Sequence, residues 1–313
     1  MRALRVVRFG PPEELAVATV PDPAPGPGEV LVEVRAASVS PLDVKNAAGG
    51  VAATTLPRIP GRDFAGVAGG RAVWGTGGGG MSVTRDGSHA ALVVRPAGAV
   101  RPMPATLSFE QAAAVGVSYT TAWLALVRRA RIGAGETVLI VGAGGSVGAA
   151  AAQIARWRGA RVLGVDRTPP AHLAAEEFIA AAQPGWDAVV RERTAGAGAG
   201  AAFDMVGGES FELTLRALRH GGRVVAISSP GQPRVSFNLA DFYHHELTLF
   251  GLDSLALTPE AGGDLLDELR PGFESGALTP PETRAFPLEE APAAYAAVAA
   301  GMRGAKVVLV PRS

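Results

Sequence analysis

The first third of the chain alternates apolar and polar positions at the period expected of β-strands. In "EVLVEVRAASV", residues 29–39, the alternation predicts a strand with one buried face. Further short strands are predicted at residues 65–75 and 88–96, separated by glycine-rich turns such as "GTGGGG". This part of the chain is therefore expected to form a compact antiparallel or barrel-like unit.

From residue 108 the pattern becomes helical, and short apolar runs then alternate with helical segments. Ser108 is predicted to cap a helix, with Gln111 completing a capping box. "TAGAGAGA", residues 194–201, is of low complexity and is expected to be a mobile loop. The alternation of strands and helices predicts right-handed βαβ units and a mostly parallel sheet. The expected strands are 137–142, 160–166, 201–208, 223–229, 247–253, 283–288 and 305–311, and the expected helices are 147–159, 209–222 and 259–275.

The most distinctive apolar run is "VLIVGAGGSVGAAAAQIA", residues 138–155, which contains no charged residue. Its length reaches the lower limit for a membrane-spanning helix, about 17–25 residues. However, Gly142, Gly144, Gly145 and Gly148 all lie within it, and each glycine costs a helix about 0.8–1 kcal/mol. Aromatic belts and basic flanks are also missing. We therefore expect no membrane span here.

The same glycines are typical of a dinucleotide-binding turn. Gly142, Gly145 and Gly148 form G-x-x-G-x-x-G between a predicted strand and a predicted helix, as the motif requires. The first glycine permits a tight turn, the middle ones let the backbone approach a pyrophosphate, and the last lets helix and strand pack closely. A tight βα turn without a ligand is the alternative. The glycines therefore predict a phosphate site that a second observation must support.

That second observation is Asp166, which ends the next predicted strand 24 residues after Gly142 (166 − 142). An acidic residue about 20 residues beyond the first glycine can accept hydrogen bonds from an adenine ribose. Arg167 follows it directly and could instead bind a ribose 2′-phosphate. The residues therefore predict NAD(P) binding but do not choose between NADH and NADPH.

Composition excludes several other functions. The chain of 313 residues has 29 basic and 29 acidic side chains and a formal net charge of zero, which argues against nucleic-acid binding. It contains no cysteine, so disulfides, thiol nucleophiles and thiolate zinc sites are excluded. The opening "MRALRVVRFG" has no apolar run of signal-peptide length, and a soluble cytoplasmic protein is expected. Adjacent His244, His245 and Glu246 do not share a helix face, so we expect a solvated helix end there and no metal site.

Six segments together resemble the medium-chain dehydrogenase/reductase superfamily, and in particular its zinc-free quinone oxidoreductases, the zeta-crystallin-like branch. The resemblance implies an α/β fold: a Rossmann domain with a doubly wound parallel sheet at residues 118–254, and a GroES-like β-rich catalytic domain built from residues 1–117 and 255–313. It places the active site in the cleft. The segments that carry it are "GEVLVEVRAASVSPLDVKNAAG", "IPGRDFAGV", "LSFEQAAAVGVSYTTAW", "VLIVGAGGSVGAAAAQIARWRGARVLGVD", "FDMVGGESFELTLRALRHGGRVVAIS" and "GAKVVLV".

Zinc-dependent members of this superfamily carry metal ligands at positions where this chain has other residues. Cysteine lies where Ser40 stands, a His–Glu pair where Arg62 and Asp63 stand, and a further cysteine near Val117. The structural zinc lobe with its four cysteines is absent as well. The resemblance therefore implies that no metal polarises the substrate.

The resemblance also assigns roles to individual residues. The glycine-rich turn would hold the pyrophosphate, and Asp166 and Arg167 would contact the ribose. Ser40 and Lys45 are the catalytic candidates, because each could donate a hydrogen bond to a developing enolate or phenolate. Quinone reductases typically carry Asn at the position of Ser40 and often Tyr at that of Lys45, so these two are departures. The implied cofactor-binding residues are Thr121, Gly142, Gly144, Gly145, Ser146, Val147, Gly148, Asp166, Arg167, Val206, Gly207, Ser228 and Lys306.

These observations predict an NAD(P)H-dependent oxidoreductase that transfers hydride to a quinone or an α,β-unsaturated carbonyl, with NADPH favoured over NADH and no zinc. Two alternatives stay open: an enoyl-thioester or secondary-metabolite tailoring reductase, and an NAD(P)H-binding sensor without turnover. The tailoring reductase would need a basic groove for a carrier phosphate, which the scattered arginines do not clearly indicate. The expected partners are a small-molecule substrate and a second copy of the chain, paired through the strand near Leu247–Leu252, and neither nucleic acid nor a membrane.

Overall fold

A computed structural model describes residues 1–174, 176–227, 232–302 and 304–311. The chain divides into two compact units, which are treated separately below. We call Thr121–Asp253 the Rossmann unit, and Met1–Thr120 with Ser254–Ser313 the split unit. The sequence placed the corresponding divisions at 117/118 and 254/255.

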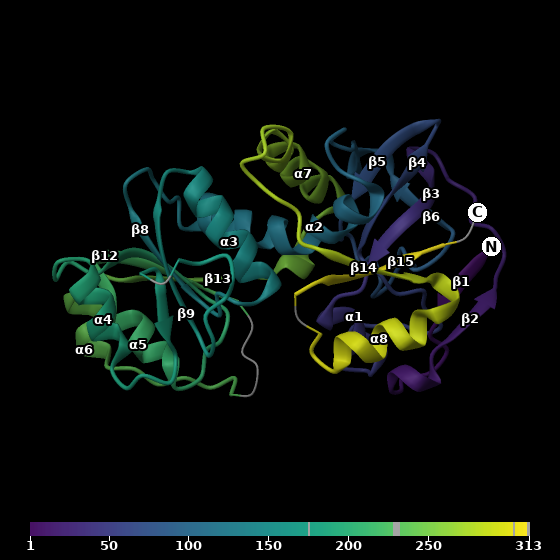
Figure 1. Cartoon of the computed structure of the whole chain (residues 1–313). Helices are drawn as coiled ribbons and strands as arrows, with labels where there is room; N and C mark the ends of the chain where they lie inside the picture. The colour runs from purple at the N-terminus through teal and green to yellow at the C-terminus, as the bar shows by residue number, and fades with distance from the viewer. Residues whose placement is uncertain (175, 228–231, 303, 312–313) are drawn as a thin grey trace. The chain divides into compact units, whose positions relative to one another are not determined.

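The Rossmann unit is built on one sheet of six parallel strands (Figure 1). Their spatial order, β10-β9-β8-β11-β12-β13, is the chain order 3-2-1-4-5-6, so the direction of winding reverses between β8 and β11. The parallel sheet predicted from the alternating pattern is therefore confirmed. The strands are β8 (Thr137–Val141), β9 (Arg161–Asp166), β10 (Phe178–Ala180), β11 (Ala199–Asp204), β12 (Leu218–Ala226) and β13 (Thr248–Gly251).

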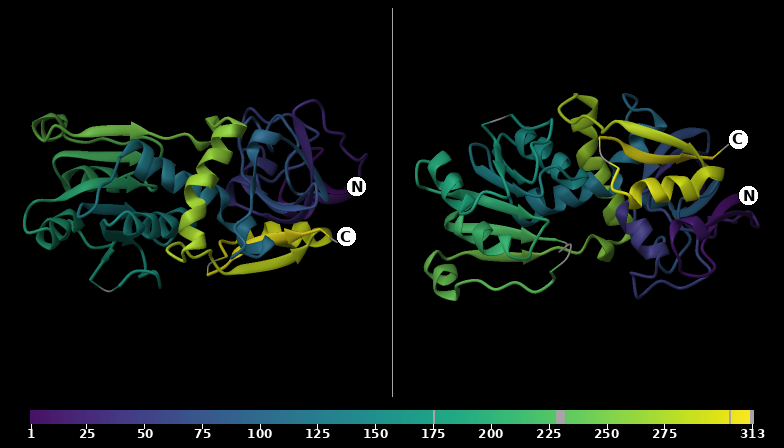
Figure 2. Two further views of the ribbon diagram at one scale, coloured as in Figure 1. Left: turned by 90° about the horizontal axis from the view of Figure 1, so that it is seen from above. Right: turned by 60° about the horizontal axis from the view of Figure 1, so that its bottom comes forward.

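Successive residues of a strand point to opposite faces of the sheet, so a buried strand has apolar side chains on both faces. Helices cover both faces of this sheet. Leu139 and Val141 of β8 belong to an apolar cluster that includes Trp186 of α4 (Trp186–Arg193) and Phe211 of α5 (Ser210–Arg216). Figures 1 and 2 show α3 (Ser146–Trp157) on the other face, where its alanines pack closely against the strands. The remaining helices are α6 (Leu239–His244) and a π-helical turn at Leu124–Arg129.

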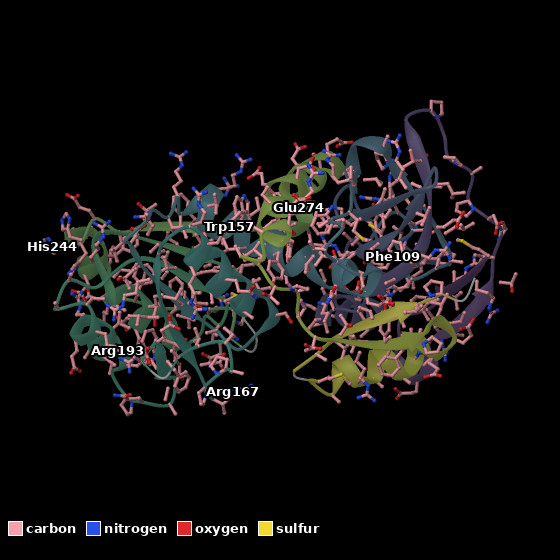
Figure 3. The ribbon with its side chains drawn as sticks, turned by 45° about the horizontal axis from the view of Figure 1, so that its top comes forward. Phe109, Trp157, Arg167, Arg193, His244 and Glu274 are labelled. Carbon is pink, nitrogen blue, oxygen red and sulfur yellow. The ribbon has the colours of Figure 1, made fainter. Side chains whose placement is uncertain are left out.

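Two predictions in this unit were wrong. The helix expected at 209–222 ends at Arg216, and Leu218 already belongs to β12, because the buried β11 beside it offers backbone partners that a further helical turn would lose. Residues 194–201, expected as a mobile loop, form a tight turn and then enter β11, where small alanines and glycines allow close packing. His244 ends α6 at the surface, as expected of a solvated helix end (Figure 3).

The split unit is centred on a seven-stranded sheet in which the long strand β3 pairs with β4, β6 and β15. The pair Val308–Ser38 joins the end of the chain to its beginning. The strands are β1 (Arg2–Arg5), β2 (Ala16–Thr19), β3 (Glu29–Ser38), β4 (Asp63–Ala68), β5 (Arg71–Gly75), β6 (Leu92–Pro96), β7 (Val100–Pro102), β14 (Thr283–Pro287) and β15 (Lys306–Val310), of which β1 and β2 form a separate hairpin. The α-helices are α1 (Pro41–Ala47), α7 (Pro259–Glu274) and α8 (Ala291–Ala299), with α2 (Phe109–Trp123) running across the division at 120/121, and short 3₁₀ turns occur at Pro12–Glu14, Ala97–Ala99, Ser254–Ala256 and Leu288–Glu290.

Several local signals in the sequence have the predicted structural effect. Ser108 and Gln111 exchange the two hydrogen bonds of a capping box at the start of α2, at 3.0 and 3.2 Å. Glycines 69 and 70 turn the predicted segment 65–75 into the hairpin β4–β5. Within the described parts of the chain, no helix has both the length and the apolar composition needed to span a bilayer.

Candidate functional site

The glycine turn, residues 142–148, connects β8 to α3 at the carboxyl edge of the parallel sheet. Gly142 has a φ of +91°, which a residue with a side chain rarely adopts, and its N–H donates to the carbonyl of Val165 at 2.9 Å. The first hydrogen bond of α3 runs from Ala149 to the carbonyl of Gly145. The N–H groups of Ser146 and Val147 therefore have no intrahelical acceptor and remain available to an anion.

The space around the turn suits a pyrophosphate. A β-carbon on Gly148 would lie 2.4 Å from the carbonyl oxygen of Gly142, so this glycine is required for packing of helix against strand. A β-carbon on Gly145 would meet nothing closer than that oxygen at 3.5 Å, an ordinary contact. Gly144, Gly145 and Ser146 are exposed. The turn thus keeps an open, side-chain-free surface that the fold itself does not fill, and the residues fit a dinucleotide.

The reversal point of the sheet brings a second predicted segment to this turn. A β-carbon on Gly142 would lie 3.2 Å from Cγ2 of Val206, which follows β11. The carboxylate of Asp204 fixes this neighbouring turn by accepting hydrogen bonds from the N–H groups of Val206 (2.9 Å) and Gly207 (2.8 Å). Asp204 was not among the predicted site residues, although its place as an acidic residue at the end of a buried strand could have identified it. Ligands of open α/β sheets bind in the crevice at such a reversal.

Asp166 lies at the end of β9 beside the same turn. One carboxylate oxygen accepts the N–H of Gly144 and the other that of Arg167, both at 2.7 Å. The side chain of Arg167 is exposed and forms no ion pair in the described part of the chain (Figure 3). Asp166 therefore stabilises the turn itself, while Arg167 remains available to a ligand.

Two predicted residues remain for this unit. Thr121 of α2 is buried, and its hydroxyl oxygen has no hydrogen-bond partner, which is costly unless a ligand or water supplies one. Ser228 lies outside the described residues.

In the split unit, Ser40 begins α1 and is engaged with Asp43. Its hydroxyl donates to Oδ2 of Asp43 at 2.5 Å, and it accepts the Asp43 N–H at 3.3 Å. The reciprocal bond from the Ser40 N–H to the same carboxylate completes a capping box. Lys45 lies one turn further along α1 with an exposed side chain whose stem passes over Gly50.

Lys306 is buried at the start of β15, where the charges of the Asp63 and Asp43 carboxylates act to raise its pKa. Asp63 accepts hydrogen bonds from the hydroxyl of Thr76 at 2.7 Å and from the N–H of Val117 at 3.0 Å. Burial lowers the pKa of Lys306 and raises the pKa of Asp63, and their mutual attraction opposes both shifts. The two groups therefore belong to a buried polar cluster of this unit.

His89 extends this buried polar cluster. Its Nε2 lies 2.9 Å from the carbonyl oxygen of Ser38, and its Nδ1 lies 2.8 Å from the hydroxyl of Tyr295. Since the carbonyl only accepts, Nε2 carries a proton, and in the neutral ring Nδ1 accepts from Tyr295. Burial lowers the pKa of His89 despite the opposing charge of Asp43, and burial raises the pKa of Tyr295. Burial thus favours the neutral form of the ring.

Arg62 is a residue that the sequence placed at a metal-ligand position without giving it a role. Its side chain is only 3% exposed, and its Nε and Nη1 have no hydrogen-bond partner. The remaining nitrogen donates to the carbonyl of Ser254 at 3.4 Å. A buried guanidinium with unpartnered donors is costly, so it marks a place where a ligand oxygen would be stabilised. In the sequence, the arginine inside the segment "IPGRDFAGV" was the signal that could have identified this residue as part of the site.

The metal-ligand positions named by the resemblance have other partners here. Ser40 bonds Asp43, and Asp63 bonds Thr76 and Val117. Among the residues that the structure describes, no group of three or more histidines, aspartates or glutamates is arranged to hold a metal ion.

Comparison with known proteins identifies the family. Residues 146–268 match the zinc-binding dehydrogenase family and residues 26–105 the alcohol dehydrogenase GroES-like domain. A zinc-type alcohol dehydrogenase-like protein of Schizosaccharomyces pombe is 36% identical over 288 residues, covering 88% of this chain and 86% of the relative. A quinone oxidoreductase of Rattus norvegicus is 31% identical over 330 residues, covering 99% of this chain and 98% of the relative. The crystal structure of an NAD-dependent alcohol dehydrogenase superposes with a TM-score of 0.89 at 30% identity, with 99% of each chain covered.

These likenesses extend over nearly the whole chain and agree with the parallel sheet, its reversal point and the glycine turn. The chain therefore belongs to the medium-chain dehydrogenase/reductase superfamily, in its quinone oxidoreductase branch, and is an NAD(P)H-dependent oxidoreductase.

Proposed function

We propose that the protein reduces a quinone or an α,β-unsaturated carbonyl with NADPH, without zinc. The observation that carries the proposal is the buried guanidinium of Arg62, with two unpartnered donor nitrogens, at the position where zinc-dependent relatives have a ligand. When bound, the cofactor supplies a hydride from C4 of its nicotinamide. Conjugated acceptors need little further help, because the electron pair delocalises onto a carbonyl oxygen.

Arg62 is the group best suited to stabilise that oxygen. A donor aimed at a developing oxyanion in a site without water contributes more than it would in solution, and removal of one such donor typically costs about 10²–10³ in kcat. Because a guanidinium keeps its proton, it stabilises the charge by hydrogen bonding alone. The proton that completes the reduction then comes from water.

Ser40 and Lys45 have different parts in this proposal. The hydroxyl proton of Ser40 is directed to Asp43, so Ser40 acts by fixing the loop before α1. Lys45 keeps an exposed ammonium, which can donate to an acceptor oxygen or a phosphate from the solvent side. Lys306 is buried at the start of β15, so in this proposal it acts on the position of that strand.

NADPH is favoured by the contacts at the end of β9. Both carboxylate oxygens of Asp166 already accept a backbone N–H, which leaves less capacity for ribose hydroxyl groups. The exposed guanidinium of Arg167 can bind a 2′-phosphate by paired hydrogen bonds. Gly144, Gly145, Ser146 and Val147 would hold the pyrophosphate.

The test is an acceptor screen. Oxidation of NADPH is followed by absorbance with 1,2-naphthoquinone, an enone and no acceptor, before and after treatment with a chelator. We expect cofactor oxidation in proportion to acceptor consumed, and no effect of chelation. Arg62→Met should lower kcat by about 10²-fold while the affinity for NADPH stays unchanged.

Arg35→Met is the matched control, since Arg35 is a half-exposed arginine whose ion pair with Glu33 lies on the surface. Binding of NADPH without oxidation by any acceptor would reject the enzyme proposal in favour of a sensor. Loss of activity on chelation, restored by zinc, would reject zinc independence.

We further propose that two copies of the chain pair through β13. This strand ends the six-stranded sheet, its backbone edge has no partner strand within the described chain, and Leu249 on it is 42% exposed. Light scattering of the wild type should give the mass of a dimer, and Leu249→Lys should shift it towards the monomer. A monomeric wild type would reject this pairing.

A further inference from the structure

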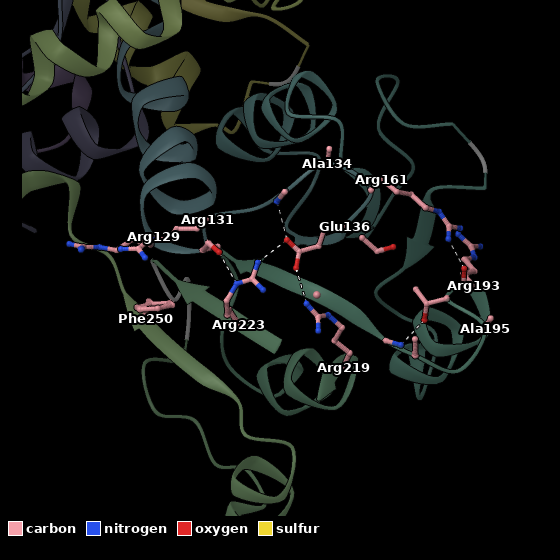
Figure 4. Close-up of a pocket in the computed structure, with 18 of the residues that line it drawn as sticks. Arg129, Arg131, Ala134, Glu136, Arg161, Arg193, Ala195, Arg219, Arg223 and Phe250 are labelled. Atoms are coloured by element: carbon pink, nitrogen blue, oxygen red, sulfur yellow. Dashed lines mark hydrogen bonds and ion pairs between the residues drawn. The ribbon is translucent and has the colours of Figure 1, made fainter. Parts of the chain in front are cut away.

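The Rossmann unit has a second concave surface, which we call the arginine groove. It encloses about 1190 Å³ and is formed by the loop before β8, the first residues of β9 and β12, and the turn after α4 (Figure 4). These segments all lie at the amino edge of the parallel sheet. The groove is therefore separate from the glycine turn, which lies at the carboxyl edge.

The groove concentrates positive charge to an unusual degree for this chain. Among the described residues that line it, seven are arginines and only Glu136 is acidic, although the whole protein has zero formal net charge. Figure 4 shows labelled arginine side chains along the groove from Arg129 at one end to Arg193 at the other. A concave surface lined by one sign of charge raises the local concentration of counter-ions. The groove is thus an electrostatic site for anions.

The fold uses only part of this charge. Glu136 accepts a hydrogen bond from Arg223 at 2.8 Å and a longer one from Arg219 at 3.4 Å. Partial burial acts to raise the pKa of Glu136, but the hydrogen bond and charge of Arg223 outweigh it, so its pKa is lowered and the carboxylate stays ionised. The single negative charge of Glu136 therefore offsets only part of the positive charge of Arg219 and Arg223.

Four of the other arginines, Arg129, Arg131, Arg161 and Arg193, have no acidic partner among the described residues. Arg161 donates to the carbonyl of Arg193 at 2.7 Å, and Arg193 to the carbonyl of Phe178 at 2.9 Å, so these two side chains are held in place without being neutralised. Arg129 and Arg131 are exposed and form neither a hydrogen bond nor an ion pair in the described part of the chain. Their positive charges face open space.

The backbone of the groove is also unusual. Arg131 and Ala195 have φ values of +50° and +52°, and they are two of only four non-glycine residues with positive φ among those described. Such conformations cost about 1–3 kcal/mol and concentrate at functional sites. Arg131 thus has a backbone conformation that glycine or asparagine would adopt at lower cost.

From these observations we propose that the arginine groove binds a small anion that carries several phosphate groups. Guanidinium groups bind phosphate oxygens in pairs, and a chain of phosphates can contact arginines from several segments at once. Phe250 of β13 lines one end of the groove and offers an apolar face to a base. The ligand is therefore either an inorganic polyphosphate or a nucleoside polyphosphate, with the phosphate chain as the shared chemistry.

The site would act independently of the cofactor turn. Thr137 lines the groove and Val141 precedes the glycine turn, so β8, at about 3.3 Å per residue, separates the two sites by about 16 Å. A ligand in the groove therefore does not displace the pyrophosphate of NADPH. It should instead stabilise the folded protein by relieving repulsion among the arginines.

The test uses calorimetric titration of the full chain with tripolyphosphate, ATP, AMP and sulfate at moderate ionic strength. We expect saturable binding of tripolyphosphate and ATP, at least about tenfold tighter than that of AMP or sulfate, and a raised Tm. Arg129→Gln with Arg131→Asn should weaken binding at least about tenfold, because two charged donors are removed without breaking an internal contact. The affinity for NADPH, measured by fluorescence in parallel, should not change.

The control variant, Arg5→Gln with Arg71→Gln, removes the same charge from two exposed positions of the split unit and should bind normally. Tighter binding of ATP than of tripolyphosphate, reversed by Phe250→Ala, would identify a nucleotide, whereas equal affinity would identify the phosphate chain alone. Absence of saturable binding, equal loss in the control variant, or tighter binding of a single-stranded RNA oligonucleotide would overturn the proposal.

Discussion

Gly145 and Gly148 lie three residues apart in the glycine turn, but a side chain would meet different surroundings at each. At Gly145 a β-carbon would have its nearest atom at 3.5 Å, and the φ of −77° is open to any residue. We therefore expect Gly145→Ala to change the free energy of unfolding by less than about 1 kcal/mol, since a small loss of helix capping offsets a gain from a stiffer unfolded chain.

The same methyl group should be costly to the cofactor. It would lie on the open surface from which the N–H groups of Ser146 and Val147 reach an anion. Loss of two charge-assisted hydrogen bonds, at about 1.5 kcal/mol each, amounts to about 3 kcal/mol, or about a hundredfold in the Kd for NADPH. Fluorescence titration measures the affinity, and thermal unfolding measures the stability of the same variant.

Gly148→Ala serves as the opposite case. Its β-carbon would lie 2.4 Å from the carbonyl oxygen of Gly142 and 2.8 Å from the backbone of Ala143, and neither can yield cheaply. Overpacking of this kind costs about 1–3 kcal/mol, so the Tm should fall by several degrees. If Gly145→Ala bound NADPH as tightly as the wild type, with an unchanged Tm, the pyrophosphate would not lie on this turn.

Three further predictions concern the charged residues. Arg167→Gln should raise the Kd for NADPH by about tenfold and leave that for NADH unchanged, and equal effects on both cofactors would exclude a 2′-phosphate contact. Lys306→Met should lower the free energy of unfolding by about 3–5 kcal/mol in urea, because the charge of Lys306 then no longer opposes the cost of burying the Asp63 carboxylate, and Asp63→Asn added to it should restore part of the loss. Burial holds the pKa of His89 below 6.5, so its contribution to stability is complete above about pH 6.5 and is lost as the pH falls through its folded-state value, by at most about 1.4 kcal/mol per pH unit. His89→Gln should flatten that part of the stability profile, and an unchanged slope would show that other groups cause it.

The sequence predicted best the features that depend on residues close together in the chain. The strand at 137–142, the turn and the helix after it all carry local signals, and the structure has them within two residues. The helix expected to continue to residue 222 illustrates the limit: Leu218 has an acceptable helical pattern, but the neighbouring strand β11 decides its structure. Local preference is overridden where a buried strand offers backbone partners.

The candidate site also has some features that local sequence predicts and others that only the folded structure reveals. The pyrophosphate turn was readable from three glycines, whereas the roles of Asp204 and Arg62 depend on hydrogen bonds made or missing in three dimensions. The arginine groove could not have been found from the sequence at all. Its arginines are spread from residue 128 to residue 223, and only the shared amino edge of the parallel strands brings them together.

The pairing of β15 with β3 has a consequence for the order in which the protein folds during synthesis. All strands of the Rossmann unit lie within one continuous stretch, so this unit can fold as soon as residue 253 has left the ribosome. The split unit must wait, because Ala37 and Ser38 at the end of β3 lack their partner on one side until β15 is made, although β4 and β6 can already pair with β3. During that interval the edge of β3 is exposed to pairing with other chains.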